Sequence, residues 1–432
     1  MTAVVLTAFA VLLVAPASAS IFDTYGFGTR GKGMANALTA SARDYHAVYY
    51  NPAQLMERSE VHVGLGLTWS EPMLFINRSL PNSPNETVLP GRNVGIHLGV
   101  STPLGGIFQD KLAFGVAFFM PLVRVTRAEF IDASTPHFYM YENLPDKLLI
   151  LFGMGAKPLE WLKLGLGVQV LADLSGSADV QMSLTDSRIT RRRLSIDLNS
   201  DLAVTAGITV TPIPGLNLAV SYRQDIDLAF SLPVTAQIEE LGVLHFDLAG
   251  TSLYSPHQIN AGVAWTLPWV PLTVALDMTY ALWSLAPSPV PTTTFSLDAS
   301  AVTGDSTPLI EAASSPRDLG AVDVFMPRIG LEYLVGDFSL RTGYAYRPTA
   351  LPAPVYDMNF VDTDAHVLTL GADWSFVDPL KVHKKPLTIG LAVQATVLRS
   401  RPINKVDPTD VTGSFAAGGA ILSIGVDLQH DF

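Results

Sequence analysis

Apolar and polar residues alternate with a period of two along most of the chain beyond residue 60. Between Val61 and Trp69, Val, Leu and Trp residues alternate with His, Gly and Thr. The same alternation recurs at 162–170 and 387–394, where one face is wholly apolar and the other is small or polar. Successive side chains of a strand point to opposite faces, so this pattern predicts β-strands with one apolar face.

About fourteen segments of this kind follow one another. They lie near 60–70, 93–102, 111–120, 148–156, 161–182, 190–211, 216–232, 244–266, 271–283, 325–334, 338–347, 365–376, 386–399 and 415–432. Short connections at 102–110, 157–160, 212–215, 267–270, 335–337 and 377–385 alternate with long ones. The longest, 284–324, is rich in Ser, Thr, Ala and Pro, and we expect it to be mobile.

The composition narrows the class of protein that these strands can form. Of 432 residues, 48% are hydrophobic and 15% are charged, and the mean hydropathy is +0.31. Soluble proteins have about 25% charged residues, so a soluble enzyme or β-sandwich is disfavoured. The net charge of −12 argues against nucleic-acid binding, and the lack of cysteine excludes disulfides and thiolate sites.

The one long apolar run, Ala3 to Ala15, is too short for a membrane-spanning helix. Pro16 and the small residues Ala17-Ser18-Ala19 follow it, so 1–19 is interpreted as a secretory signal peptide, although no Lys or Arg precedes the run. An N-terminal membrane anchor is the alternative. A hydrophobic, exported chain without a spanning helix predicts a transmembrane β-barrel, because a closed barrel satisfies every backbone hydrogen bond in lipid.

The sequence therefore predicts an all-β fold, a 14-stranded antiparallel transmembrane barrel over 58–432. An even strand number with alternating short and long connections places both chain ends at the periplasmic end. Residues 20–57 lack the alternation and are rich in Gly and Ala, and Ala35–Ala42 has helical propensity. Because wall side chains cannot fill so wide a lumen, we expect 20–57, the hatch segment, to plug it.

The hatch segment resembles that of the FadL/TodX family of outer-membrane transporters for hydrophobic compounds. The resemblance is carried by Gly26-Phe27-Gly28-Thr29-Arg30-Gly31, Ala35, the run to Tyr50, and Asn51-Pro52-Ala53. Further stretches resemble the family at GVAFFMP (115–121), SPHQINAGVAWTLPWVPLTVALDMTYALW (255–283), PRIGLEYLVGDFSLRTGYAYRP (327–348) and DTDAHVLTLGADWSF (362–376). Together they span nearly the whole mature chain.

The resemblance implies a monomeric barrel that takes up long-chain fatty acids or other hydrophobic compounds and releases them sideways through the wall. It also implies that Asn51, Pro52 and Ala53 pack beside an inward kink in the third strand. Gly115 is the expected kink residue because glycine tolerates unusual backbone conformations, with Pro121 as the alternative. If Gly115 is only a small inward residue, the wall is closed there.

Inward positions suggest where a hydrophobic ligand could bind. Phe119, Leu149 and Leu151 are apolar at positions where a water-filled porin would carry charges. They are candidate ligand contacts, because burial of apolar area drives transfer of a hydrophobe from water, or they pack against the hatch segment.

Three inward arginines, Arg223, Arg328 and Arg341, are candidate partners for a fatty-acid carboxylate, since a guanidinium offers paired donors. Alternatively, Arg328 and Arg341 pair with Glu332 or Asp277.

Two long loops carry further candidate sites. Phe138, Tyr139, Met140 and Tyr141 form an unusually apolar stretch, which predicts an external landing site for hydrophobes unless it folds down onto the hatch segment. The triplet 191–193 is Arg-Arg-Arg, which could bind lipopolysaccharide phosphates or simply form a solvated turn.

The function predicted first is passive outer-membrane transport of hydrophobic molecules in a Gram-negative cell. The alternatives are a structural or scaffolding barrel that retains the plug without transport, and a general porin. No catalytic Ser/His/Asp arrangement or metal-ligand spacing of the nine His residues stands out, so no enzyme activity, cofactor or metal is predicted. The expected partners are a hydrophobic small molecule, outer-membrane lipid or lipopolysaccharide, and the barrel assembly machinery, which the terminal strand ending in Phe432 would engage; no nucleic-acid partner is expected.

Overall fold

The computed structural model describes residues 20–78, 88–123, 134–141, 148–183, 188–238, 242–304, 308, 310–314, 318–354, 358–379, 384–405 and 412–432, with the backbone alone at 172–183, 188–199, 252 and 301–302. Within these ranges most regular structure is β-strand, as the alternation predicts. The helices are short, and none in the described ranges has the length and apolarity needed to cross a membrane.

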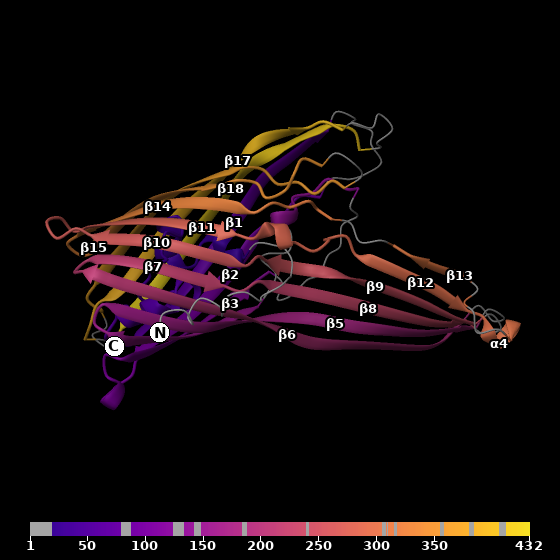
Figure 1. Cartoon of the computed structure of the whole chain (residues 1–432), viewed down its shortest axis with the longest axis horizontal. Helices are drawn as coiled ribbons and strands as arrows, with labels where there is room; N and C mark the ends of the chain where they lie inside the picture. Colours follow the sequence, from indigo (N-terminus) through magenta and orange to yellow (C-terminus); the bar gives the residue numbers. More distant parts are fainter. Residues whose placement is uncertain are drawn as a thin grey trace, which may run out of the picture.

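Fourteen of the described strands form a closed antiparallel barrel, which confirms the predicted fold (Figure 1). The ring closes because β1 pairs with both β2 and β18. The barrel strands are β1 (His62–Arg78), β2 (Asn93–Pro103), β3 (Leu112–Pro121), β4 (Leu149–Leu159), β5 (Leu162–Ser183), β6 (Arg188–Ile213), β7 (Leu216–Arg223), β10 (Gln258–Thr266), β11 (Leu272–Ala281), β14 (Val324–Val335), β15 (Phe338–Arg347), β16 (Ala365–Phe376), β17 (Leu387–Ile403) and β18 (Phe415–Asp431).

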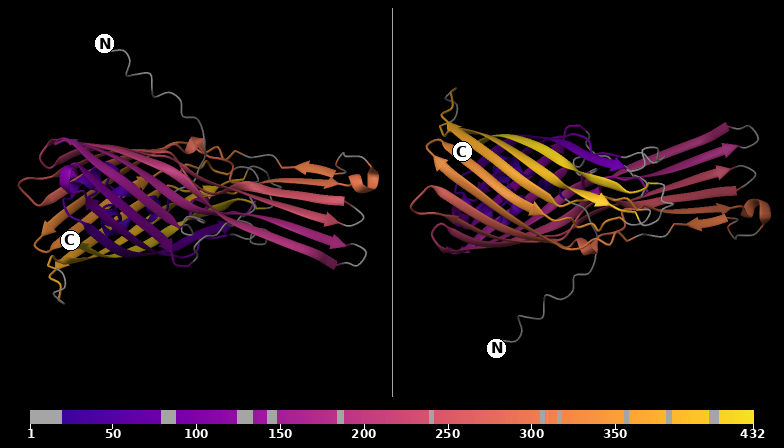
Figure 2. Two further views of the ribbon diagram at one scale, coloured as in Figure 1. Left: turned by 90° about the horizontal axis from the view of Figure 1, so that it is seen from below. Right: turned by 90° about the horizontal axis from the view of Figure 1, so that it is seen from above.

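The two ends of the barrel differ in their connections. One end, here called the short-turn end, carries the turns β4–β5, β6–β7, β10–β11 and β14–β15 and the C-terminus (Figure 2). The 3₁₀ helix η2 (Gly106–Phe108) lies in the β2–β3 connection at this end. The opposite end, the long-loop end, carries the longer connections, including η3 (Tyr139–Tyr141) and η4 (Trp283–Leu285).

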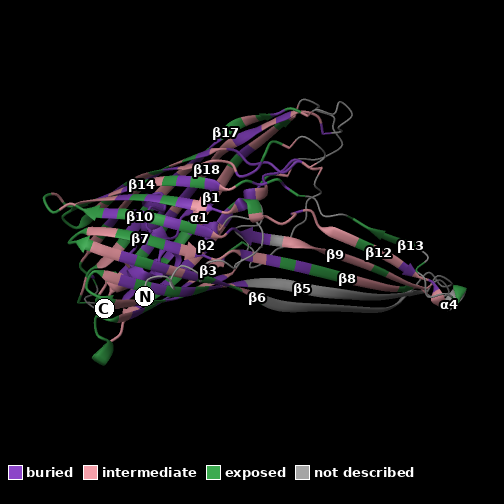
Figure 3. Cartoon of the chain, viewed as in Figure 1, coloured by how far each residue is buried: buried purple, intermediate pink, exposed green. Residues whose placement is uncertain are grey.

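Barrel side chains alternate between an exposed apolar outer face and a buried inner face (Figure 3). In β18, Val426 and Leu428 are 42% and 45% exposed, whereas Asp427 between them is 1% exposed. Such an outer surface suits lipid rather than water, because it leaves a continuous band of apolar area uncovered by protein.

A second sheet region, the arm, extends beyond the long-loop end (Figures 1 and 2). It contains β8 (Ile226–Ile238), β9 (Gly242–Ser255), β12 (Thr292–Asp298) and β13 (Ile310–Ala313), together with the distal parts of β5 and β6. The short helix α4 (Ser300–Thr303) connects β12 to β13. Within the arm, the distal part of β5 pairs in parallel with β8, so its strand order differs from that of the barrel.

The arm corrects two details of the sequence prediction. The segments predicted at 216–232 and 244–266 each divide into two strands, and the second break falls at Pro256, which has no N–H to offer a ladder. The connection 284–324, expected to be mobile, contains β12 and β13. A run of Thr and Phe at 292–295 has high strand propensity, and it pairs with the edge that β9 offers beyond the barrel.

The hatch segment lies within the ring of strands and is buried almost throughout (Figure 2). It contains α1 (Ile21–Tyr25), α2 (Gly28–Gly33), α3 (Ala47–Tyr50) and the 3₁₀ helix η1 (Pro52–Glu57). The helix expected at Ala35–Ala42 is absent from this described stretch. Ala35 and Asn36 adopt φ of 50° and 63°, which ends α2, and Asn36 Nδ2 bonds to the Phe22 carbonyl at 3.2 Å.

Candidate functional site

The hatch segment is hydrogen-bonded to strands on several sides of the lumen. Backbone and side-chain donors of the segment reach carboxylates and a hydroxyl on four wall strands. The bonds are Thr29 N–H to Asp427 Oδ2 at 2.7 Å, Arg30 Nη2 to Glu332 Oε2 at 2.9 Å, Thr39 N–H to Asp277 Oδ2 at 2.8 Å and Asn51 Nδ2 to Thr209 Oγ1 at 3.1 Å. The wall partners lie on β18, β14, β11 and β6, so the hatch is held from all around rather than from one edge.

The triplet Asn51-Pro52-Ala53 starts η1. Asn51 Oδ1 accepts the Ala53 N–H at 3.1 Å, an N-cap bond, while Asn51 Nδ2 donates to the Thr39 carbonyl at 2.9 Å. The wall beside the triplet is built from glycine. A methyl group at Gly165 in β5 would stand 2.0 Å from the Ala53 nitrogen, and one at Gly207 in β6 1.9 Å from Asn51 Oδ1.

This placement corrects the expectation that the triplet packs beside the third strand. Gly115 in β3 contacts other parts of the hatch, because a methyl group there would stand 2.6 Å from Val48 and 2.7 Å from Leu55. The ladders β2–β3 and β3–β4 run without a register shift past Gly115. In this conformation the wall is closed at Gly115, and neither it nor Pro121 forms a kink that parts the strands.

The apolar candidates Phe119, Leu149 and Leu151 are 3%, 3% and 1% exposed. Phe119 meets Phe22 of the hatch edge-on with ring centroids 5.4 Å apart. All three residues belong to one buried cluster with the hatch. The alternative stated for them, packing against the hatch segment, is therefore the arrangement that the structure has.

Two of the three candidate arginines are paired with carboxylates. Arg341 donates from Nε to Glu332 at 2.7 Å and from Nη1 to Asp373 at 2.6 Å. Arg223 Nη1 lies 3.0 Å from Asp23 Oδ2, and its guanidinium sits 3.8 Å from the ring centre of Tyr49. Arg223 thus joins the wall to the hatch segment, whereas Arg341 pairs with carboxylates of the neighbouring wall strands β14 and β16.

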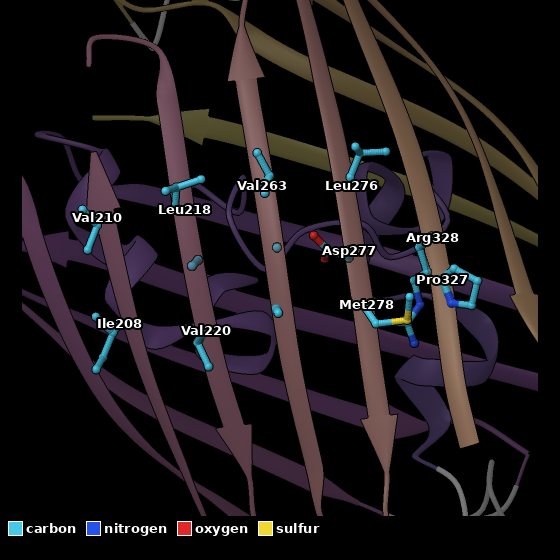
Figure 4. A pocket seen from close by; sticks show the side chains of 13 residues that line it. Ile208, Val210, Leu218, Val220, Val263, Leu276, Asp277, Met278, Pro327 and Arg328 are labelled. Carbon is cyan, nitrogen blue, oxygen red and sulfur yellow. The ribbon is translucent and has the colours of Figure 1, made fainter. Parts of the chain in front are cut away.

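Arg328 is different. It donates to Thr279 Oγ1, and among the described residues it has no carboxylate within salt-bridge distance. It also lies on the β14 side of a predominantly apolar cavity of about 680 Å³ in the barrel wall (Figure 4). Outward apolar side chains of β6, β7, β10 and β11 line this wall groove, among them Ile208, Leu218, Val220, Val263 and Leu276.

The predicted landing residues are buried rather than exposed. Phe138, Met140 and Tyr141 are 0%, 1% and 2% exposed, so they form the interior of the long-loop end. Tyr139 is half-buried, and its ring lies 5.4 Å from that of Phe360. An apolar stretch in an external loop can either form a binding surface or fold into the interior. Here Phe138, Met140 and Tyr141 fold into the interior.

A mainly apolar cavity of about 300 Å³ does open at the long-loop end, next to this cluster. Its lining includes Leu319, Leu351, Met358 and Phe360, none of which stood out in the sequence. They lie in connections without alternation, so no periodic signal marks them. The contact between Tyr139 and Phe360 links this mouth cavity to the buried landing residues.

The short-turn end of the lumen is charged. Glu332 is 1% exposed and binds three guanidinium groups, those of Arg30, Arg43 and Arg341, at 2.6 to 2.9 Å. Two polar cavities of about 170 and 210 Å³ flank this cluster, and Arg30 and Arg43 line both. The lumen thus changes from apolar to ionic between its two ends.

Buried Lys32 adds a further polar contact between hatch and wall. Its Nζ donates to Ser423 Oγ at 2.6 Å and to the Tyr25 carbonyl. Burial lowers the pKa of Lys32 to about 7, although the nearby Asp427 carboxylate counteracts part of this shift.

Three buried residues that the sequence did not bring together form a cluster beside Lys32. His46 of the hatch, His97 of β2 and Asp427 of β18 offer ligand atoms within 4.8 Å of one another. His46 lies in the N-terminal segment and Asp427 in the last strand, so no local sequence spacing could reveal that they meet. The triplet at 191–193 lies in β6, but its side chains are outside the described residues.

Solved structures similar to this chain include a FadL homologue, a toluene transporter and a hydrocarbon channel. A Pseudomonas aeruginosa FadL homologue aligns with a TM-score of 0.59 and 14% identity, covering 96% of this chain and 98% of that chain. The P. putida toluene transporter TodX aligns with a TM-score of 0.58 and 16% identity, covering 94% and 98%. The CymD monoaromatic hydrocarbon channel aligns with a TM-score of 0.57 and 16% identity, covering 94% and 97%.

No protein-family model matches the chain, and a comparison with curated protein sequences finds no match. The structural matches extend over nearly the full length of both partners at low identity, and they establish the fold. The chain has the FadL/TodX fold, as the resemblance of its sequence predicts.

Proposed function

We propose that this chain is a monomeric outer-membrane channel for the passive uptake of hydrophobic small molecules. The observation that carries the proposal is the apolar continuity of the lumen from the long-loop end inward. One buried cluster includes Leu319, Leu351 and Phe360 at the mouth cavity, Phe138 beneath them, and Phe22 in the hatch. A hydrophobe entering the mouth cavity therefore meets apolar side chains down to the hatch.

Two further observations favour a hydrophobic substrate over a polar one. Solved structures with this fold include a toluene transporter and a monoaromatic hydrocarbon channel. A general porin would need an open polar passage, whereas here the hatch side chains fill the lumen at β3 and β4. A scaffolding barrel remains the second candidate, and the closed wall in this conformation is the feature that favours it.

For the exit we propose release sideways into the membrane, after movement of the hatch. A route straight through the short-turn end would take an apolar solute past Glu332 and its three arginines, where it would replace strong ionic contacts with none. The wall beneath η1 is built from glycines of β3, β4, β5 and β6: Gly115, Gly153, Gly155, Gly165, Gly167 and Gly207. Displacement of η1 would leave bare backbone there, so this glycine strip is the proposed exit face.

The substrate test compares a fatty acid with an uncharged hydrocarbon. Arg328 is the candidate arginine with no carboxylate within salt-bridge distance among the described residues, although it lies opposite Asp277 in the β11–β14 ladder, and it is the proposed partner for a fatty-acid carboxylate. Cells producing Arg328→Met should take up labelled oleate more slowly at limiting concentration and labelled toluene at the wild-type rate. Equal rates of oleate uptake in wild type and variant would remove Arg328 from the proposal.

The mouth cavity is tested by Leu351→Ser. Loss of one apolar contact of about 1.5 kcal/mol should reduce capture about tenfold, raising the substrate concentration for half-maximal uptake. Ile107→Ser is the matched control, because Ile107 is 81% exposed at the short-turn end, away from the mouth. If both variants behave alike, the mouth cavity does not capture substrate; if wild type takes up neither compound, the scaffolding function replaces transport.

A further inference from the structure

The cluster of His46, His97 and Asp427 joins three separate parts of the molecule. His46 precedes α3 in the hatch, whereas His97 and Asp427 point inward from β2 and β18. The three residues are 2%, 2% and 1% exposed. His97 Nε2 stands 3.2 Å from Asp427 Oδ1, and one ligand atom of each residue lies within 4.8 Å of the others.

The ligand atoms of this cluster make one contact among themselves, the 3.2 Å pair of His97 Nε2 and Asp427 Oδ1, and His46 Nε2 makes none. Among the described residues, His46 Nε2, His97 Nε2 and Asp427 Oδ1 are buried and make no hydrogen bond of normal geometry. Buried polar atoms are rarely left in this condition, because an unsatisfied group costs about 1–3 kcal/mol. Three such atoms from three residues facing one another call for a shared partner.

The surrounding groups orient the three residues as ligands. Asp44 Oδ1 lies 2.6 Å from His46 Nδ1 and also accepts the His46 backbone N–H at 2.8 Å. This arrangement keeps the proton on Nδ1 and leaves the lone pair of Nε2 free, as a carboxylate does for metal-binding histidines. Asp427 Oδ2 accepts the Thr29 N–H and hydroxyl at 2.7 and 3.0 Å, which leaves Oδ1 for another partner.

Two glycines keep the space beside these atoms clear. A methyl group at Gly28 would stand 2.0 Å from His46 Nε2. One at Gly66 in β1 would stand 2.1 Å from Asp427 Oδ1 and 2.4 Å from His97 Nε2. Any side chain at either position would therefore collide with the ligand atoms. The polar cavity of about 170 Å³ at the short-turn end is lined by Asp44, the partner of His46, so it comes close to the cluster.

We propose that His46, His97 and Asp427 bind a late first-row divalent metal ion, with Zn²⁺ as its representative. Two imidazole nitrogens and one carboxylate oxygen suit such ions, whereas Mg²⁺ and Ca²⁺ prefer shells of oxygen ligands. Small side-chain movements bring the three atoms to the distances of about 2.0–2.2 Å that zinc requires. The bound ion cross-links the hatch segment to β2 and β18, the two strands that flank β1.

The test is direct metal binding to the purified full-length protein in detergent. After treatment with a chelator and its removal, Zn²⁺ titration followed by calorimetry should give one site per chain. His97→Gln should weaken Zn²⁺ binding by roughly 100-fold and Asp44→Asn by roughly tenfold, since loss of an orienting partner costs less than loss of a ligand. Mg²⁺ should give no binding in wild type.

His257→Gln is the matched control. His257 also pairs with an aspartate, lying 3.2 Å from Asp225, but it stands outside the cluster, so its replacement should leave Zn²⁺ affinity unchanged. Hydrogen exchange gives a second readout. Zn²⁺ should slow exchange at 44–51 in wild type and in His257→Gln, and should have no effect in His97→Gln.

Two results would overturn the assignment. One is the absence of a stoichiometric Zn²⁺ site in wild type, and the other is an unchanged affinity in both His97→Gln and Asp427→Asn. Heat-dependent migration of the folded barrel in gel electrophoresis verifies that each variant is folded. If one variant fails to fold, the other carries the test. Because binding and exchange are measured without a substrate, the outcome is independent of the proposed transport.

Discussion

The two ends of the lumen differ in the polarity of the side chains that line them. At the long-loop end, Leu351, Phe360 and Phe138 form an apolar interior that opens into a cavity of about 300 Å³. At the short-turn end, buried Glu332 holds several arginines together between two polar cavities. Under the proposed function, the apolar end would be a favourable entrance for a hydrophobe and the ion pairs at the other end a barrier to it.

This difference suggests that ion pairs hold the hatch segment at the short-turn end, whereas apolar side chains surround it at the end where we propose that a solute enters. Burial of apolar area stabilises a contact by about 25 cal/mol per Å² and does not require a particular orientation of the groups. Paired buried charges add little net stability, but they require a defined geometry, and breaking one pair is costly. The charged end therefore determines the position of the hatch, while the apolar end tolerates a variable ligand.

The largest expected effect comes from removal of the shared carboxylate at the charged end. Glu332→Gln leaves the guanidinium groups of Arg30, Arg43 and Arg341 close together without their common partner, at a cost of about 3–5 kcal/mol. The hatch should loosen while the barrel remains folded. Trypsin should then cleave the hatch at Arg30 or Arg43, and the ion conductance of the protein in planar bilayers should rise.

Glu160→Gln is the control for that variant. Glu160 pairs with Lys157 at 3.0 Å, but its side chain is 91% exposed, so loss of this pair should leave both trypsin resistance and conductance at wild-type values. Wild-type behaviour of Glu332→Gln would contradict the view that the charged end fastens the hatch.

A smaller effect is expected where η1 lies on the glycine strip. In Gly165→Ala the new methyl group would stand 2.0 Å from the Ala53 backbone nitrogen, so η1 must shift at a cost of about 1–3 kcal/mol. Hydrogen exchange at 52–57 should accelerate. Gly105→Ala is the control, because a methyl group there meets nothing within 4 Å. Unchanged exchange in Gly165→Ala would mean that η1 does not depend on this contact.

The pH dependence of hatch docking gives a further prediction. The pKa of Lys32 falls from 10.5 to about 7 on burial, so between these values the released hatch binds a proton that the docked hatch lacks. Docking should therefore strengthen as pH rises from 7 toward 10.5, and the full cost of burying the charge remains below pH 7.

Calorimetry of hatch release at about pH 6 and about pH 9 measures this slope. Lys32→Met removes the titrating group and should flatten the slope, whereas Lys111→Met, at an exposed position, should retain it. An equally steep slope in Lys32→Met would assign the dependence to other groups.

The barrel could be predicted from the sequence because alternation reports a local property. Val426, Asp427 and Leu428 point alternately outward and inward in any strand, and the solvent on each side determines their chemistry. Strand number and the presence of a separate N-terminal segment follow from the same pattern. The sequence predicted the arm only in part. Its strand order depends on a parallel pairing of β5 with β8, which no local sequence pattern encodes.

The contacts inside the lumen could be predicted less well. Asn51 was expected beside the third strand, but its place is determined by the glycine at 207, more than a hundred residues away in sequence. Arg341 was correctly seen as a possible partner of Glu332, because their strands are adjacent. Phe138 and Tyr141 lie in an apolar loop stretch, and such a stretch is expected both of a buried loop and of a binding surface. Only the three-dimensional surroundings show which of these it is.

Transport of two solutes through the purified protein in lipid vesicles tests the central claim most directly. In vesicles whose outer leaflet is lipopolysaccharide, the wild-type protein should accelerate entry of labelled toluene or oleate by about tenfold over protein-free vesicles, because the polar sugar layer rather than the lipid core retards a hydrophobe. Sucrose should not enter faster than in empty vesicles, since we expect the buried hatch segment to obstruct the lumen. Rapid sucrose entry would identify a porin, and no acceleration of either hydrophobe would contradict transport altogether.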